Sequence, residues 1–303
     1  MEALAIEAEG LVKTYGKGVR ALDGLGFAVE AGIVFGLLGP NGAGKSTTVK
    51  ILTTLARADE GRAVVAGYDV VRESDRVRRA IGVVGQKPGV DPEATGRENL
   101  RLHADLYGLP PREARARVDE LLERFALAEA AGRLARTYSG GMQRRLDVAM
   151  GLVHRPEVLF LDEPTTGLDP EARAELWEEI ERLARDEGVT VLLTTHYLEE
   201  ADRLAADVAI VDRGRVVAQG SPDRLKSELR GDAVHVELAE ATANGRVHAA
   251  LGAVSGIADV AVDGRFVHAR AERGATAVAS TSCSSSSGSP TRATASSART
   301  PAG

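Results

Sequence analysis

Continuous apolar runs recur along the first two thirds of the chain, and each has the length of a strand. Residues 33–38, 158–161, 189–195 and 208–211 form such runs with little polar interruption. This pattern is typical of strands that are buried on both faces of a parallel sheet. Residues 171–186 have an amphipathic helical pattern. The combination predicts an α/β domain with a largely parallel sheet.

Two further patterns lie within the same part of the chain. Residues 4–31 alternate apolar and polar positions, which predicts antiparallel strands beside the main sheet. Helical patterns cover residues 98–106 and 111–125, with proline breakers around them, and another helix is predicted after residue 139. We therefore expect a helical insertion of about residues 90–150 within a first domain of residues 1–228.

After residue 228 the pattern changes. Residues 234–238 alternate as a strand, a helix is predicted near 241–251, and residues 260–267 predict a hairpin around an Asp-Gly turn signal. We expect a small α+β accessory domain over residues 229–274.

The last segment, residues 275–303, has no Asp, Glu, Lys, Leu, Ile or aromatic residue. It is predicted to be a disordered Ser/Thr/Ala-rich tail, because it has too little apolar surface to bury. The abrupt change of composition also prompts the hypothesis that a reading-frame change replaced the native end. The single cysteine, Cys283, lies here and provides neither an internal disulfide nor a cysteine metal cluster.

Composition narrows the possible functions. Of the 303 residues 44% are hydrophobic, enough for a sizeable core, and the net charge of −6 argues against a broad basic surface for nucleic acid. No apolar stretch approaches the ~18–20 residues that span a bilayer, and no signal-peptide pattern opens the chain. We expect any membrane role to come through a partner.

The first apolar run leads into a phosphate-binding sequence. Residues 39–46, GPNGAGKS, match G-x-x-x-x-G-K-[ST] at every fixed position. A helix is predicted from Thr47, with residues 49, 52, 55 and 56 on its apolar face. Glycines let backbone N–H groups turn inward, and the helix N-terminus adds partial positive charge, so this segment favours phosphate over the alternative of a chance glycine-rich turn. Lys45 adds a charge for the β- and γ-phosphates, and the Ser46 hydroxyl is a ligand for Mg²⁺, so we predict a nucleoside triphosphate with Mg²⁺. The predicted nucleotide-binding residues of this segment are Gly39, Asn41, Gly42, Gly44, Lys45, Ser46 and Thr47.

Two other segments of the chain have residues suited to binding or hydrolysing a nucleoside triphosphate. The run at 158–161 ends in Asp162 and Glu163. One carboxylate at a strand end can hold Mg²⁺, and its neighbour can take a proton from the attacking water, a role that typically contributes ~10²–10⁴-fold. The alternative is two solvated acids. Residues 139–141, Ser-Gly-Gly, open a predicted helix whose N-terminus would meet anionic oxygen, although most such triplets are flexible turns.

Taken in order, these motifs resemble those of the ATP-binding cassette (ABC) ATPases over about residues 4–230. The matches are Tyr15 to the adenine-stacking aromatic, Gly39–Thr47 to Walker A, Gln86 to the Q-loop, Ser139–Gly141 to the signature, Val158–Glu163 to Walker B, Gly167–Asp169 to the D-loop and His196 to the H-loop. Residues 138–147 and 162–170 are most similar to ATP-binding subunits of daunorubicin-resistance-type drug exporters. Met142 departs from the glutamine that many members have, yet we expect a functional site.

The resemblance implies a P-loop NTPase core with an antiparallel β subdomain, a helical insertion and residue roles. Lys45 would contact the phosphates, Asp162 and Ser46 would order Mg²⁺, and Gln86 would reach Mg²⁺ or the attacking water. Glu163 would be the general base and His196 would contact the γ-phosphate, unless His196 only packs. Tyr15 would stack on adenine, or be an ordinary half-buried core tyrosine. Ser139, Gly140, Gly141 and Asp169 would lie at the seam of an ATP-bound dimer.

The same resemblance implies partners. Two copies of the chain would sandwich ATP, and the helical insertion would meet a separate membrane permease at the cytoplasmic face of the membrane. The expected function is export of a drug-like or other amphipathic molecule, with no nucleic acid bound; the cargo and the permease are not encoded here. The alternatives are a soluble ABC ATPase acting on nucleic acid or ribosomes, and an unrelated P-loop kinase or GTPase, which would leave residues 138–143 and His196 unexplained.

Overall fold

The computed structural model describes residues 3–228, 232–237, 257–263 and 266–271. The chain divides into two compact units, Met1–Leu225 and Lys226–Gly303, which are described separately. The predicted helix at 241–251 and the predicted tail at 275–303 lie outside the described residues. The boundaries proposed near residues 228 and 274 stay predictions.

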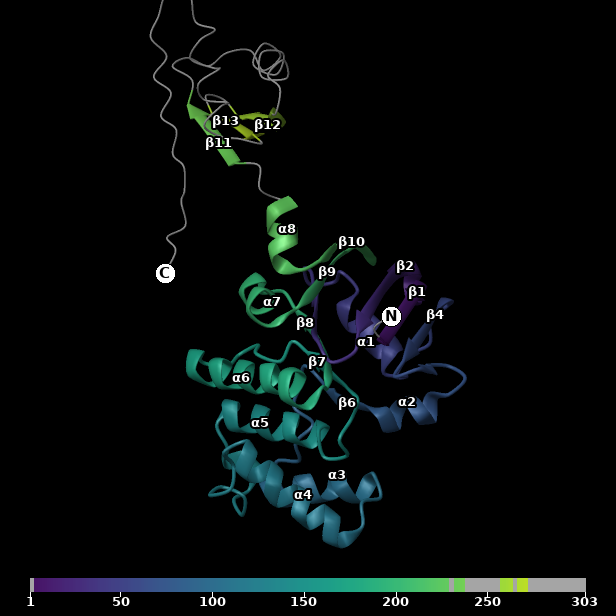
Figure 1. The fold of residues 1–303 in the computed structure, drawn as a ribbon, viewed down its shortest axis with the longest axis vertical. Coiled ribbons are helices and arrows are strands. Elements are labelled where there is room, and N and C mark those ends of the chain that lie inside the picture. The colour runs from purple at the N-terminus through teal and green to yellow at the C-terminus, as the bar shows by residue number, and fades with distance from the viewer. Residues whose placement is uncertain (1–2, 229–231, 238–256, 264–265, 272–303) are drawn as a thin grey trace, which may run out of the picture. The chain divides into compact units, whose positions relative to one another are not determined.

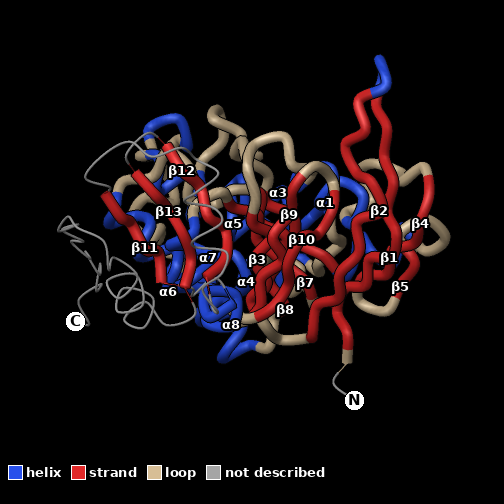
Figure 2. The backbone as a smooth tube through the Cα atoms, turned by 90° about the horizontal axis from the view of Figure 1, so that it is seen from above, coloured by secondary structure: helices blue, strands red, loops and turns tan. Residues whose placement is uncertain are grey.

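The first unit contains an antiparallel sheet in the order β2-β1-β4-β5 (Figure 2). Its strands are β1 (Leu4–Tyr15), β2 (Val19–Glu30), β4 (Glu60–Val65) and β5 (Tyr68–Asp69). In register, Ile6 lies opposite Val29 on one side and Val65 on the other. The antiparallel strands expected over residues 4–31 are therefore confirmed, whereas β4 and β5 have no counterpart in the sequence-based prediction.

A six-stranded sheet in the order β10-β9-β3-β8-β7-β6 forms the centre of this unit. Its strands are β3 (Val34–Leu38), β6 (Ile81–Val84), β7 (Val158–Asp162), β8 (Thr190–Thr195), β9 (Asp207–Asp212) and β10 (Arg215–Gly220). All neighbours pair in parallel except β9 and β10. The α/β fold class with a largely parallel sheet is confirmed.

Strand β7 shows why these strands are apolar throughout. Leu159 and Leu161 belong to the core on the helical side of the sheet, whereas Val158 and Phe160 belong to the core that faces the antiparallel sheet. Because successive side chains of a strand point to opposite faces, two buried faces require an uninterrupted apolar run.

Helices cover the sheet and form a separate layer at one end of the unit (Figure 1). The helices near the sheet are α1 (Lys45–Leu52), α2 (Ser74–Ala80), α6 (Pro170–Glu187) and α7 (Leu198–Leu204), and α8 (Pro222–Glu228) begins in this unit. The helical layer contains α3 (Gly96–Leu106), α4 (Pro111–Arg124) and α5 (Gly140–Gly151), with a short 3₁₀ turn at Ala135–Thr137 before α5. Another 3₁₀ turn, Gly16–Gly18, joins β1 to β2. The helices expected at 98–106, 111–125 and after 139 are thus found.

Helix α1 differs from the prediction at its C-terminal end. It ends at Leu52, and the Leu55 side chain is 72% exposed rather than on the buried face. Thr54 adopts a left-handed conformation (φ 64°), and the Ala56 amide closes back on the Lys50 carbonyl at 2.9 Å. The chain therefore leaves the helix one turn earlier than the spacing of apolar residues indicates.

The second unit contains a three-stranded antiparallel sheet in the order β11-β13-β12. Its strands are β11 (Asp232–Glu237), β12 (Ile257–Asp263) and β13 (Phe266–Ala271). Strands β12 and β13 pair with Val262 opposite Val267, which is the hairpin expected around residues 263–264.

Candidate active site

The phosphate loop joins β3 to α1 at the carboxyl end of the parallel sheet. Two of its glycines are required by space, and one of the two is also required by backbone conformation. A Cβ on Gly39 would lie 2.3 Å from the Val211 carbonyl oxygen, and one on Gly44 would lie 2.7 Å from the Ala21 carbonyl oxygen. Gly44 also has a φ of 112° at the N-cap of α1, a conformation that side chains disfavour. The loop backbone thus leads directly into a helix N-terminus, where amide groups favour anions.

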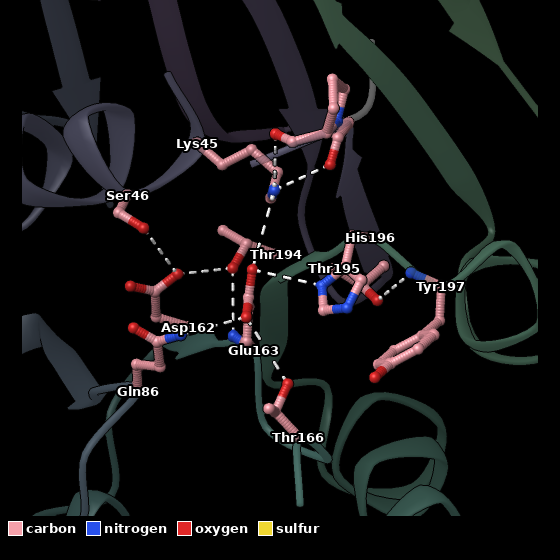
Figure 3. A network of polar contacts seen from close by, with 12 residues as sticks. Lys45, Ser46, Gln86, Asp162, Glu163, Thr166, Thr194, Thr195, His196 and Tyr197 are labelled. Atoms are coloured by element: carbon pink, nitrogen blue, oxygen red, sulfur yellow. Dashed lines mark hydrogen bonds and ion pairs between the residues drawn. The ribbon is translucent and has the colours of Figure 1, made fainter. Parts of the chain in front are cut away.

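Lys45 is the first residue of α1, and it is almost completely buried. Its Nζ donates to the carbonyl oxygens of Gly39 at 2.8 Å and Pro40 at 3.2 Å, and it lies 3.7 Å from Oε1 of Glu163. The ammonium group is therefore held over the loop by backbone oxygens, with one carboxylate as its charge partner (Figure 3). A phosphate group placed at this ammonium would meet a fixed positive charge.

Asp162 lies at the end of β7, beside the hydroxyl groups of two residues. Its Oδ1 accepts hydrogen bonds from Oγ1 of Thr194 at 2.6 Å and Oγ of Ser46 at 3.3 Å. Asp162 and Thr194 are register partners on the neighbouring parallel strands β7 and β8, so the sheet itself brings them together. Hydroxyl and carboxylate oxygens are the ligands that Mg²⁺ prefers, so Ser46 and Asp162 fit a magnesium ion.

Glu163 follows Asp162 and has a left-handed backbone with φ 49°. Its amide donates to Oγ1 of Thr194 at 3.0 Å. Three side chains meet its carboxylate in addition to Lys45: Gln86 Nε2 at 3.2 Å, His196 Nδ1 at 3.4 Å and Thr166 Oγ1 at 3.5 Å (Figure 3). A non-glycine residue in this conformation is strained, and such strain clusters at functional sites.

The remaining predicted site residues lie outside this network. Ser139 caps α5 and accepts a hydrogen bond from the Met142 amide at 3.2 Å, and Asp169 caps α6 in the same way with the Ala172 amide at 2.9 Å. A Cβ on Gly141 would lie 2.8 Å from Cβ of Ala172, so the first turns of α5 and α6 are in close contact. Gly140 lies at the same N-terminus.

Tyr15 lies at the end of β1 with 40% of its surface exposed, and Lys13 Nζ is 5.7 Å from its ring centroid. The structure therefore brings together Lys45, Ser46, Gln86, Asp162, Glu163 and His196. It does not bring Tyr15, Ser139, Gly140, Gly141 or Asp169 to them.

Sequence reasoning missed Thr194 and Arg144. The guanidinium of Arg144, on α5, donates to the carbonyl oxygens of Gly85 and Pro164 at 2.7 Å and of Asp162 at 3.4 Å. It also lies 3.2 Å from Asp147, whose other carboxylate oxygen accepts from the Gly89 amide at 2.9 Å. Burial lowers the pKa of Arg144 and raises the pKa of Asp147. Arg144 thus joins the signature helix to the ends of β6 and β7. The only sequence signal for its ion pair is that it lies one helical turn before Asp147.

The fold and the site together define an ATP-hydrolysing domain of the ATP-binding cassette class. The sequence model of the ABC transporter family matches residues 22–166. The chain is 55% identical over 241 residues to the daunorubicin resistance ATP-binding protein DrrA3 of Streptomyces coeruleorubidus, which covers 80% of this chain and 76% of that protein. The chain therefore belongs to the ATP-binding proteins of ABC transporters, and it is an ATP-binding ATPase.

Solved structures of ABC transporter ATP-binding cassettes have the same fold. CbiO1 of Clostridium perfringens, described as part of the ABC transporter complex cbiONQ, superimposes with a TM-score of 0.69 at 30% identity, covering 75% of this chain and 92% of that one. The dimeric ATP-binding cassette MJ0796, bound to ADP and Pi, gives 0.66 at 26% identity, covering 72% and 98%. Among the described residues, no helix is both long and apolar enough to cross a membrane.

Proposed function

We propose that this chain is the ATP-hydrolysing motor subunit of an ABC exporter, which moves a drug-like or other amphipathic small molecule through a separate membrane permease. One observation carries the proposal. A network of ATPase-type polar groups centred on Glu163 is present in a chain that is 55% identical to a daunorubicin resistance ATP-binding protein.

The geometry supports a role for each group in hydrolysis. Glu163 is the general base, because its carboxylate is only partly exposed beside the loop that would hold the phosphates and Nδ1 of His196 lies 3.4 Å from it. Lys45 neutralises the β- and γ-phosphates, and the phosphate loop (Gly39, Asn41, Gly42, Gly44, Ser46 and Thr47) surrounds them. His196 and Gln86 contact the γ-phosphate or the attacking water, while Tyr15 stacks on adenine.

Ser46, Asp162 and Gln86 would hold the magnesium ion. When bound, the ion supplies positive charge that neutralises the phosphate oxygens. The protein contributes the positions of its ligands, because Thr194 fixes the Asp162 carboxylate at 2.6 Å and Ser46 is fixed by the start of α1.

Two copies of the chain form the complete site. Ser139, Gly140 and Gly141 lie at a helix N-terminus outside the network of their own subunit, so we infer that they meet the γ-phosphate held by the other subunit. Asp169 then lies at the seam. The dimeric assembly of the relative bound to ADP and Pi supports this arrangement.

A surface hollow of about 740 Å³ supports docking of a permease at the cytoplasmic face of the membrane. Leu55, Val83, Leu106 and Tyr107 line it, and each of these large apolar side chains is at least 41% exposed. Grouped exposed apolar side chains mark interaction sites. Val83 lies on the edge strand β6 and Leu106 on α3, and the charged residues Asp75, Arg78 and Arg79 of α2 also line the hollow. An amphipathic segment of the permease is the proposed occupant.

A pull-down tests the proposal. Tagged Glu163→Gln protein is held with ATP in its native cells, extracted in mild detergent, and its partners are identified by mass spectrometry. Recovery of a polytopic membrane protein in roughly equal amount is expected, and Leu106→Asp, which places a charge in the hollow, should abolish that recovery while the ATP-bound dimer persists. Recovery of ribosomes or DNA-bound proteins alone would instead favour the soluble ABC ATPase.

A further inference from the structure

The segment that follows His196 is joined to α6 by a stack of three side chains. The Tyr197 ring packs on the His196 ring, with centroids 4.0 Å apart and planes inclined at 38° (Figure 3). On α6, Cζ of Arg173 lies 5.8 Å from the centroid of the Tyr197 ring, within the range of a cation–π contact. Within the described part of the chain, Nε of Arg173 is buried and makes no hydrogen bond. Tyr197 is therefore the aromatic contact that links His196 to α6.

A buried carboxylate makes a second link one turn further along. Glu200 is only 1% exposed, and its Oε1 accepts hydrogen bonds from Oγ1 of Thr165 at 2.8 Å and Nε1 of Trp177 at 3.1 Å. Thr165 comes two residues after Glu163, and Trp177 lies on α6. A buried carboxylate is costly unless its oxygens are hydrogen-bonded, so these contacts are specific.

The two links are adjacent. Tyr197 is the N-cap of α7 and Glu200 lies in the first turn of that helix, while Arg173 and Trp177 are four residues apart on α6, the spacing of neighbours on one helix face. Thr165 belongs to the loop from Glu163 to Asp169, so its hydrogen bond to Glu200 connects this loop to the same contacts. His196, this loop and the start of α6 are thus connected by contacts that belong to no nucleotide-binding motif.

We propose that Tyr197 and Glu200 are positioning residues that make His196 and the loop 163–169 move as one body. This inference rests on the proposed function, in which His196 contacts the γ-phosphate and Asp169 lies at the dimer seam. Arg173 is only one turn from Asp169, and its amide donates to the Asp169 carbonyl at 3.0 Å. A shift of His196 toward the γ-phosphate therefore displaces Asp169, the N-cap of α6. Because Asp169 lies at the dimer seam, this displacement transmits a change at one nucleotide site to the other.

Tyr197 gives the cleaner test, because 40% of its surface is exposed and its removal leaves the core intact. In purified full-length protein, Tyr197→Ala should lower kcat about tenfold, since a misplaced catalytic group costs up to ~10²-fold. The affinity for ATP should be unchanged, and the Hill coefficient for ATP should fall toward one. Tyr197→Phe keeps the ring and should restore both values. Leu198→Ala, the exposed neighbour, is the matched control and should behave as wild type.

A double-mutant cycle separates positioning from general destabilisation. If Tyr197 acts through His196, adding Tyr197→Ala to His196→Ala should change nothing further. The same four variants can be compared without ATP turnover in the Glu163→Gln background. The quantity measured is then the dissociation constant of the ATP-bound dimer, obtained by ultracentrifugation.

Additive effects in the cycle, wild-type kcat and Hill coefficient in Tyr197→Ala, or an equal loss in Leu198→Ala would each overturn the proposal. A wild-type enzyme that hydrolyses ATP without cooperativity would overturn the coupling while leaving the proposed ATPase intact. A wild-type chain that neither hydrolyses ATP nor dimerises would contradict the proposed function itself.

Discussion

Replacing Arg144 by alanine removes the side chain that joins the signature helix to the ends of two sheet strands. The guanidinium is 5% exposed and donates to three backbone carbonyl oxygens, those of Gly85, Asp162 and Pro164. In the alanine variant, these three carbonyl oxygens lose the buried guanidinium as their hydrogen-bond donor. It also removes the charge partner of the Asp147 carboxylate, which keeps the hydrogen bond from the Gly89 amide.

The expected loss follows from this geometry. Removing one partner of a buried ion pair costs about 3–5 kcal/mol, because the other charge stays buried without compensation. Hydrogen bonds to charged groups contribute roughly 1.5–3 kcal/mol each, so three of them support the upper part of that range. For a unit of this size, 1 kcal/mol shifts Tm by about 2–4 °C, so Tm should fall by roughly 6–20 °C.

Urea unfolding followed by the fluorescence of Trp177, the single tryptophan, measures this loss. Arg145→Ala is the matched control, since the neighbouring arginine is more exposed and pairs with Glu175 at the surface; its loss should be within about 1 kcal/mol. Arg144→Lys should fall between the two, because an ammonium cannot reproduce the planar fork. Equal losses in Arg144→Ala and Arg145→Ala would refute the reasoning.

Four further predictions concern the site and its surroundings. Lys45→Ala should abolish hydrolysis and most ATP binding, measured with a fluorescent nucleotide; unchanged turnover would contradict the phosphate-loop assignment. Glu163→Gln should bind ATP, hydrolyse it at least ~10²-fold more slowly and accumulate as dimers on size exclusion, whereas normal turnover would place the base elsewhere. Ser139→Arg should bind ATP but fail to dimerise, and a stable ATP-bound dimer would argue against the sandwich. Burial lowers the pKa of His154, so the unfolded chain binds more protons, and the contribution of His154 to stability should be lost as pH falls below about 6.5. Urea midpoints between pH 5 and 8 should show this slope. His154→Gln should reduce it, and the remainder should come from His103, whose pKa burial also lowers.

Much of the fold follows from local pattern. Residues 33–46 predict a buried strand, a glycine turn and a helix start because each step has its own signature: an apolar run, a glycine spacing and a lysine–serine pair. The structure has β3, the loop and α1 in these places. The end of α1 was not predictable in this way, because Leu55 continues the apolar spacing although the backbone has already turned away at Thr54.

The residues that sequence reasoning missed depend on tertiary contacts. Thr194 resembles any threonine of a buried strand, and its bond to Asp162 exists only because β7 and β8 pair in one particular register. Arg144 resembles its neighbour Arg145, yet one is buried and the other is partly exposed. Strand pairing and helix packing decide these differences, and neither is encoded within a window of a few residues.

The donors around Glu163 suggest why nucleotide binding and activation of the base belong together. Lys45, Gln86 and His196 all face this one carboxylate, and in the proposed mechanism the same three groups contact the phosphates, the metal or the attacking water. ATP and Glu163 therefore compete for the same positive and hydrogen-bonding groups. When the phosphates take these donors, the carboxylate oxygens of Glu163 are released from them and can accept a hydrogen bond from the attacking water. Glutamine at position 163 removes the negative charge that competes for Lys45 as well as the base, and for this reason the variant should retain ATP rather than merely turn it over slowly.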